Sequence, residues 1–136
     1  SRSKRIAGLI GVAAAPDFTK ELYKDLSLKN KKQIKKNGQV EIRSKEYSLK
    51  YIITKKLIID GKKNFVLKKN FSFNKPIILI HGIKDTVVSL KTPFDILKKC
   101  AGSNIQLKII KKEGHRLSSN QGIKTILKSI EELLHY

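Results

Sequence analysis

A run of four apolar residues, Ile77 to Ile80, constrains the fold of this 136-residue chain more than any other segment. The run is too short for a helix and has no polar face, which is typical of a strand buried on both faces of a parallel sheet. His81-Gly82 ends the run, so we expect Asp85 in a loop at the carboxyl end of the strand. Open α/β sheets carry their chemistry at that edge. The segment therefore predicts an α/β fold with a functional loop directly after this strand.

A second strand with a reactive residue behind it follows downstream. Residues 105–110 read Ile-Gln-Leu-Lys-Ile-Ile, which predicts a strand, and the next turn leads to His115. Asp85 and His115 would then each stand just past a strand. A carboxylate and an imidazole in these places need a third partner for nucleophilic catalysis, and that partner determines what the chain can do.

The remaining pattern alternates strands and helices. In order, it predicts a buried strand at 6–15 that Pro16 ends, helices at 18–26 and 28–36, a loop or short hairpin over the next ten residues, a helix at 48–60, the strand at 77–80, a helix at 92–101, the strand at 105–110 and a helix from 123 to 134. Asp17 is the expected N-cap of the first helix. This order predicts a parallel α/β sheet with a helical insertion after the first strand.

Residues 48–60 fit two structures. The tripeptides 51–53 and 57–59 have strand propensity, whereas the apolar residues at 49, 52, 53 and 57 have helical spacing. Asp60-Gly61 would end such a helix. We favour the helix.

The chain carries a net charge of +19, which raises the question of a nucleic-acid partner. Lysine supplies most of this charge and is scattered along the sequence. Arginine, which forks onto phosphates and base edges, occurs only at positions 2, 5, 43 and 116. We therefore interpret the charge as solvated surface and expect no specific nucleic-acid partner. Binding to nucleic acid or to an anionic surface stays the alternative function.

Other features bear on location and cofactors. No apolar stretch approaches the roughly 20 residues of a membrane span. The first fifteen residues share the basic start and apolar middle of a signal peptide, but Pro16-Asp17-Phe18 opens a helix and the chain has a single cysteine, so we expect a cytoplasmic protein. His81, His115 and His135 lack the spacing of a zinc site, and we expect neither a metal nor a cofactor.

Three segments together resemble the α/β-hydrolase superfamily. HGIKDTVVS is similar to the strand-seven segment of that family, His-Gly-x-x-Asp-x-x-Val, with Asp85 and Val88 in place and Ser89 where proline is frequent. EGHRLS is similar to the Gly-His turn after strand eight, and GLIGVAAAPDF to strand six and the start of the helical cap. More narrowly, GLIGVAAAPDFTKEL, YIITKKLIIDGKK and EGHRLS resemble bacterial relatives of the mitochondrial acyl-protein thioesterase, also called mycophenolic acid acyl-glucuronide esterase.

The resemblance implies a single partial domain over residues 1–136. It assigns 1–16 to strand six, 17–75 to the helical cap insertion, and 76–136 to strands seven and eight with their helices. Asp85 would be the acid of a serine hydrolase and His115 its base. Phe18, Leu22 and Tyr23 would line an acyl pocket, although a packing role suits them equally well. The substrate of the complete protein would be a small acyl ester or thioester.

One departure from the family pattern stands out. The chain contains no Gly-x-Ser-x-Gly, which in this family follows strand five and brings the nucleophile, and the oxyanion hole also lies upstream of strand six. The chain also has no methionine, even at position 1. We therefore expect the C-terminal half of a hydrolase, from a broken gene or a cut chain, that is inactive alone. Its partner would be the N-terminal half, or a second copy that pairs through residues 6–12.

Four other residues compete for functional roles. Asp17 follows strand six, where some α/β hydrolases keep their acid, but it also suits a helix cap. Cys100 lies on the apolar side of its helix, which indicates a core thiol rather than a nucleophile. His81 is interpreted as structural, and His135 as a residue of the fraying end of the chain.

Overall fold

The computed structural model of the chain describes residues 6–44, 49–102 and 104–136. Its contacts group the chain into two units, the first made of Ser1–Ala15 with Leu67–Tyr136 and the second of Pro16–Val66. Residues 1–5 of the segment that we assigned to strand six lie outside the described residues, and each unit is taken by itself below.

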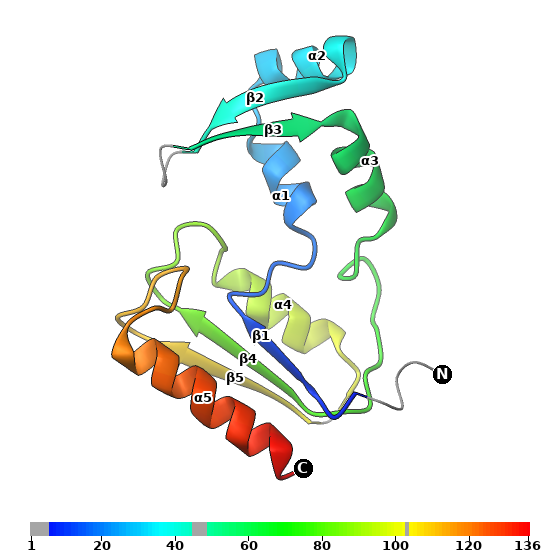
Figure 1. Ribbon diagram of the computed structural model, residues 1–136. Coiled ribbons are helices and arrows are strands. Elements are labelled where there is room, and N and C mark those ends of the chain that lie inside the picture. Colours follow the sequence, from blue (N-terminus) through cyan, green and yellow to red (C-terminus); the bar gives the residue numbers. More distant parts are fainter. Residues whose placement is uncertain (1–5, 45–48, 103) are drawn as a thin grey trace. The chain divides into compact units, whose positions relative to one another are not determined.

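Three parallel strands form the sheet of the first unit (Figure 1). They are β1 (Leu9–Val12), β4 (Ile77–Gly82) and β5 (Ile105–Ile110), in the spatial order β1-β4-β5. All six residues of β4 are buried, because β4 lies between two strands and has a helix on each face. The register aligns Ile77 with Leu9 on one side and with Ile105 on the other. The predicted α/β fold with a parallel sheet is confirmed.

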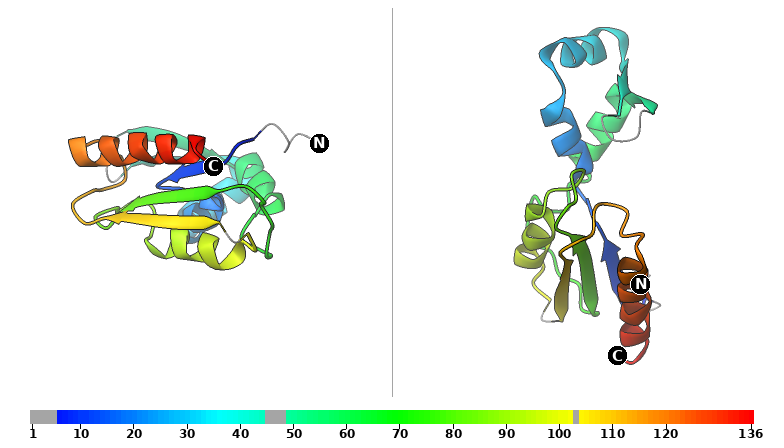
Figure 2. Two further views of the ribbon diagram at one scale, coloured as in Figure 1. Left: turned by 90° about the horizontal axis from the view of Figure 1, so that it is seen from below. Right: turned by 90° about the vertical axis from the view of Figure 1, so that its left-hand side faces the viewer.

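Two helices cover the faces of this sheet, α4 (Lys91–Lys99) on one side and α5 (Asn120–Leu134) on the other, as Figure 2 shows. The alternation of β4 divides its side chains between two apolar clusters. Ile78 and Ile80 pack with Leu133 of α5, whereas Ile77 and Leu79 pack with Ile96 of α4. Both predicted helices are therefore present, and the one predicted at 92–101 lies one residue earlier at its start.

The second unit consists of a β-hairpin and three helices. The hairpin strands are β2 (Gln39–Arg43) and β3 (Lys50–Thr54), and the helices are α1 (Phe18–Asp25), α2 (Leu28–Asn37) and α3 (Lys55–Lys63). Leu26, Ile34, Val40 and Ile53 form its buried core. Gly38 ends α2 with a φ of 77°, a conformation that glycine adopts without strain.

The helix predicted at 48–60 is wrong in its first half, and residue 48 lies outside the described residues. Residues 50–54 form β3, because pairing with β2 places Ile53 opposite Val40 in the core. Ile52, which the helical stripe would bury, is exposed instead. The helix begins only at Lys55, where the Thr54 hydroxyl accepts a hydrogen bond from the N–H of Leu57 at 3.0 Å.

Two further expectations in this unit need correction. Gly61 lies inside α3 and does not end it. A glycine stands at this position because a Cβ would overlap the side chain of Thr19 on α1. Asp17 occupies the N-cap position of α1, but its side chain makes no capping hydrogen bond. Its Oδ1 accepts instead from the N–H of Val66 at 2.7 Å, at the other end of the same unit.

The strand predicted at 6–15 forms only over Leu9–Val12 and is not buried. Ala13 has a positive φ of 45° directly after it, and Leu9 and Val12 are 46% and 39% exposed. Within the described part of the chain, β1 has a neighbouring strand on one side only. Its other side is an open edge, which is a template for pairing with another strand. The helices of the described ranges include none with the length and apolarity that a membrane crossing requires.

Hydrogen exchange should resolve the two sides of β1. The N–H groups of Leu9 and Ala13 donate to the carbonyls of Pro76 and Ile80 at 2.9 Å each, so they should exchange slowly at every protein concentration. Successive N–H groups along a strand point to opposite sides, so those of Ile10 and Val12 face the open edge. We expect them to exchange rapidly in dilute solution and to become protected as a second copy pairs with the edge at high concentration. Slow exchange of Ile10 and Val12 in a dilute monomer would contradict an open edge.

Candidate functional site

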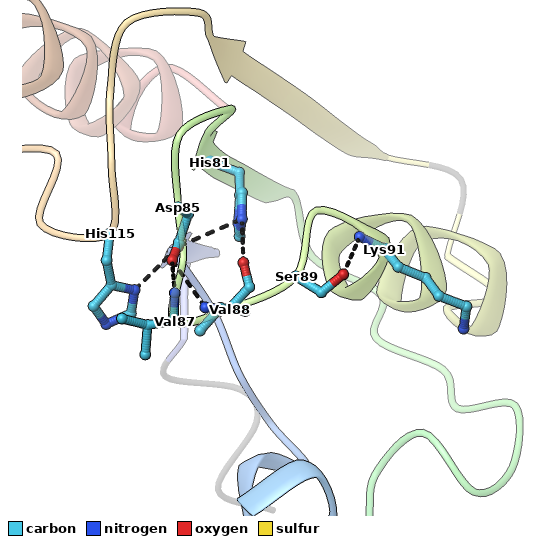
Figure 3. Close-up of polar contacts among 7 residues, drawn as sticks. All are labelled: His81, Asp85, Val87, Val88, Ser89, Lys91 and His115. Carbon is cyan, nitrogen blue, oxygen red and sulfur yellow. Dashed lines mark hydrogen bonds and ion pairs between the residues drawn. The ribbon is translucent and has the colours of Figure 1, made fainter. Parts of the chain in front are cut away.

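Asp85 lies in the loop that follows β4, where its carboxylate is held at both oxygens (Figure 3). Oδ1 accepts hydrogen bonds from the N–H groups of Val87 and Val88, each at 2.8 Å. This is the local turn that aspartate side chains commonly make with the backbone two and three residues ahead. The Asp85 side chain is 1% exposed, so the contacts around it determine its charge and orientation.

His115 lies in the loop after β5 and meets the other oxygen of this carboxylate. Its Nδ1 is 3.0 Å from Oδ2 of Asp85, and its side chain is 30% exposed (Figure 3). Because an ionised carboxylate can only accept, Nδ1 carries the hydrogen of this bond. The structure thus brings together the two residues that the sequence placed behind neighbouring strands.

Backbone hydrogen bonds join the two loops that carry these residues. The N–H of Ile83 donates to the carbonyl of Ile110 at 3.0 Å, and the N–H of Lys84 to the carbonyl of Glu113 at 2.8 Å. These bonds continue the pairing of β4 with β5 beyond the last strand residues. Gly82 is required for this approach, since a Cβ there would overlap the Glu113 carbonyl. The distance between the Asp85 carboxylate and the His115 imidazole therefore depends on the sheet register.

A contact between Glu113 and Ser119 closes the His115 loop, and sequence reasoning did not predict it. Glu113 is buried, and its Oε1 accepts a hydrogen bond from the Ser119 hydroxyl. The same hydroxyl accepts from the N–H of Gly122 at 3.2 Å and so caps α5. A carboxylate at the exit of a strand with a serine cap six residues later is the only signal that could have indicated it.

The surroundings of Asp85 keep its carboxyl ionised. Burial, the largest single influence, raises its pKa. The N–H groups of Val88 and Val87 and the His115 imidazole act in the opposite sense and together hold the pKa of Asp85 below its ordinary value. Near neutral pH the carboxylate can therefore orient the imidazole and stabilise its positive charge.

The competing candidates lie elsewhere or play other parts. Asp17 belongs to the second unit, where it binds the N–H of Val66. Cys100 is buried in the cluster under α4, which agrees with a core thiol. His135 follows α5, with its Nδ1 2.7 Å from the carbonyl of Glu131. His81 is buried beside Asp85, with its Nε2 3.5 Å from Oδ2.

The residues predicted to bind an acyl group are all on α1 of the second unit. Phe18 is 53% exposed, whereas Leu22 and Tyr23 pack against the core of that unit. Their role toward a substrate stays a prediction. Among the described residues, no three His, Cys, Asp or Glu side chains gather as a metal site would require.

Nearly all of the chain is similar to one part of several longer proteins. No family model matches it. The human palmitoyl-protein thioesterase ABHD10, mitochondrial, is 26% identical over an alignment 136 positions long that covers 98% of this chain and 44% of the human protein. A putative hydrolase from Agrobacterium vitis S4 has a TM-score of 0.86 at 25% identity, over 93% of this chain and 49% of that structure. The mouse α/β-hydrolase domain-containing protein 10 also gives 0.86, at 21% identity, over 98% and 54%.

The chain matches the C-terminal half of an α/β hydrolase. It spans about half the length of the relatives to which it is similar. The α/β hydrolases named above thus confirm the fold and the part of it that the sequence motifs indicated.

Asp85→Asn should destabilise this chain in a pH-dependent way. The amide keeps an acceptor for Val87 and Val88 but turns N–H groups toward His115, so we expect a loss of about 1.5–3 kcal/mol at pH 7, as is usual for hydrogen bonds to a charged group. Because folding lowers the pKa of Asp85, its stabilising contribution is complete above the ordinary carboxyl pKa of about 4 and is lost as the pH falls through the lower folded value.

Urea unfolding followed by circular dichroism at pH 7 and at pH 3 or below measures this difference. Asp95→Asn is the matched control in the same unit, because the ion pair that Asp95 makes with the exposed Lys91 is screened by solvent and its loss should cost less than about 1 kcal/mol. A loss for Asp85→Asn that is equal at both pH values, or no larger than that of the control, would contradict the prediction.

Proposed function

We propose that this chain provides the general base and its supporting acid to a serine hydrolase that cleaves acyl esters or thioesters. One observation carries the proposal: the contact of 3.0 Å between Nδ1 of His115 and Oδ2 of Asp85, at the carboxyl ends of adjacent parallel strands. With Nδ1 engaged, Nε2 is the nitrogen that can exchange a proton with a reacting group. The partial exposure of the His115 ring is consistent with this use.

The chemistry assigned to the two residues is proton transfer. Nε2 of His115 takes the proton from an attacking hydroxyl while the oxygen of that hydroxyl bonds to the acyl carbon. The resulting imidazolium gives its proton to the departing alkoxide or thiolate, and a water molecule then repeats the sequence to release the acid. Asp85 remains ionised throughout and stabilises the imidazolium.

The nucleophile and the oxyanion hole would come from another polypeptide segment. The 136-residue sequence contains no Gly-x-Ser-x-Gly motif, which forms the turn that exposes the nucleophile in these enzymes. The open edge of β1 is where an N-terminal half would add its neighbouring strand. When that half is absent, pairing of two copies through residues 6–12 is the alternative way to cover the edge.

The substrate class rests on the relatives. The human and mouse proteins are named palmitoyl-protein thioesterases, which supports an acyl thioester or ester as the substrate here. Phe18, Leu22 and Tyr23 are the residues that we assign to the acyl chain. The cytoplasmic location expected from the sequence stays a prediction, since the names of the same relatives place those proteins in mitochondria.

The chain alone should hydrolyse a short p-nitrophenyl ester no faster than its own His115→Ala variant. A general base without a nucleophile to activate cannot begin covalent catalysis. Turnover that His115→Ala abolishes and that a serine-directed phosphonate blocks would contradict the proposed division of the active site.

Fusion to the N-terminal part of the Agrobacterium vitis hydrolase, the part that this chain does not match, tests the assigned acid. We expect the fusion to hydrolyse the ester and Asp85→Asn to lower its kcat by about 10⁴-fold, the loss typical of a triad acid that is replaced by asparagine. Asp17→Asn is the matched control and should change kcat less than about tenfold. Equal or reversed effects would move the acid to Asp17, and activity that survives His115→Ala would refute the proposed base.

A further inference from the structure

A second imidazole, that of His81, contacts the carboxylate that His115 binds. His81 is the fifth residue of β4, and its side chain is 1% exposed. Its Nε2 is 3.1 Å from the carbonyl of Val88 and 3.5 Å from Oδ2 of Asp85, as the dashed lines in Figure 3 show. The ring therefore spans the loop that carries Asp85, from the strand to its far end.

Hydrogen-bond accounting places the single hydrogen of this ring on Nε2. Both oxygens near Nε2 are acceptors, because one belongs to a carbonyl and the other to an ionised carboxylate. The other nitrogen, Nδ1, is buried and has no hydrogen-bond partner among the described residues. A hydrogen on Nδ1 would be a buried donor without an acceptor, and the lone pair of Nε2 would face two oxygens. The structure thus favours the Nε2–H tautomer, opposite to the tautomer of His115.

We propose that His81 is a positioning residue, which closes the Asp85 loop through its Nε2–H and so sets the orientation of the carboxylate toward His115. This inference rests on the proposed function only in treating Asp85 and His115 as the acid and base.

The hydrogen bonds of His81, Asp85 and Val88 form a closed network around the Asp85 loop. Val88 donates its N–H to Oδ1 of Asp85 and accepts from His81 at its carbonyl, so this one residue is held at both backbone groups. The Val88 side chain is buried, so this end of the network is held in the interior of the protein. Oδ1 thus binds two backbone N–H groups, while Oδ2 lies between two imidazoles, which leaves the carboxylate little freedom to rotate away from His115.

The chemistry of the ring suits this position. A lysine or an arginine here would place a full positive charge beside Asp85 and compete with the His115 cation for it. The Nε2–H of His81 supplies a hydrogen-bond donor without that charge.

Nitrogen-15 NMR of histidine-labelled chain tests the inference directly, because the sequence contains only three histidines. Spectra recorded at about pH 9, well above the ordinary pKa of free histidine, distinguish the two tautomers by the shifts of the ring nitrogens. We expect His81 to be the Nε2–H tautomer and His115 the Nδ1–H tautomer. A His81 ring with its hydrogen on Nδ1 would overturn the inference. A His115 ring without a hydrogen on Nδ1 would refute the proposed acid–base pair as well, which separates the two failures.

Two variants then test whether His81 acts through Asp85. His81→Leu removes the donor, so we expect the Nδ1–H fraction of His115 to fall at least several-fold toward the mixture seen in free histidine. His81→Gln keeps an N–H donor near the position of Nε2 and should restore most of that fraction. His135→Gln, at the far end of α5, should change nothing. If the His115 tautomer is the same in a folded His81→Leu chain, the inference is wrong. If His81→Leu does not fold, the folded His81→Gln variant decides. A large fall in the Nδ1–H fraction of His115 in that variant would overturn the inference, and an unchanged fraction would support it.

Discussion

The parallel pairing of β4 with β5 is the interaction on which the rest of the site depends. Parallel strands end at the same edge, and the register aligns Gly82 with Ile110 where both strands finish. From there the backbone bonds of Ile83 and Lys84 carry the pairing into the loops. Asp85 and His115 lie together because their loops follow two paired strands, and the pairing of the strands is enough to bring the loops together.

The sequence predicted this part of the molecule because its pattern is local and strong. A central strand with two covered faces must be apolar at every position, and Ile77 to Ile80 satisfy that condition. The helix at the end of the chain followed equally from its spacing. A carboxylate and an imidazole directly behind two such strands leave little choice about where they meet. The contacts of His81 and Glu113 were beyond such reasoning, because they depend on which atoms of a side chain face which loop.

The errors fall where a distant partner decides the structure. Residues 50–54 have apolar side chains at both helical and strand spacing, and only β2 across the hairpin selects the strand. Asp17 suits a helix cap by its type, yet its oxygen is taken by Val66, a residue 49 positions away. Residues 9–12 have the composition of a buried strand, but Leu9 and Val12 are exposed because β1 has one neighbour in the described sheet. In each case the local preference was real, and a tertiary contact or its absence outweighed it.

The joined loops also bear on the thermodynamics of assembly. Asp85 and His115 belong to one unit, and backbone hydrogen bonds already hold their loops against each other. Most of the conformational entropy of this pair is therefore lost when the chain folds, before any partner arrives. If the proposed function holds, a polypeptide that brought a nucleophile to this edge would meet an imidazole that is already in place, and its binding free energy would not have to offset the ordering of that side chain.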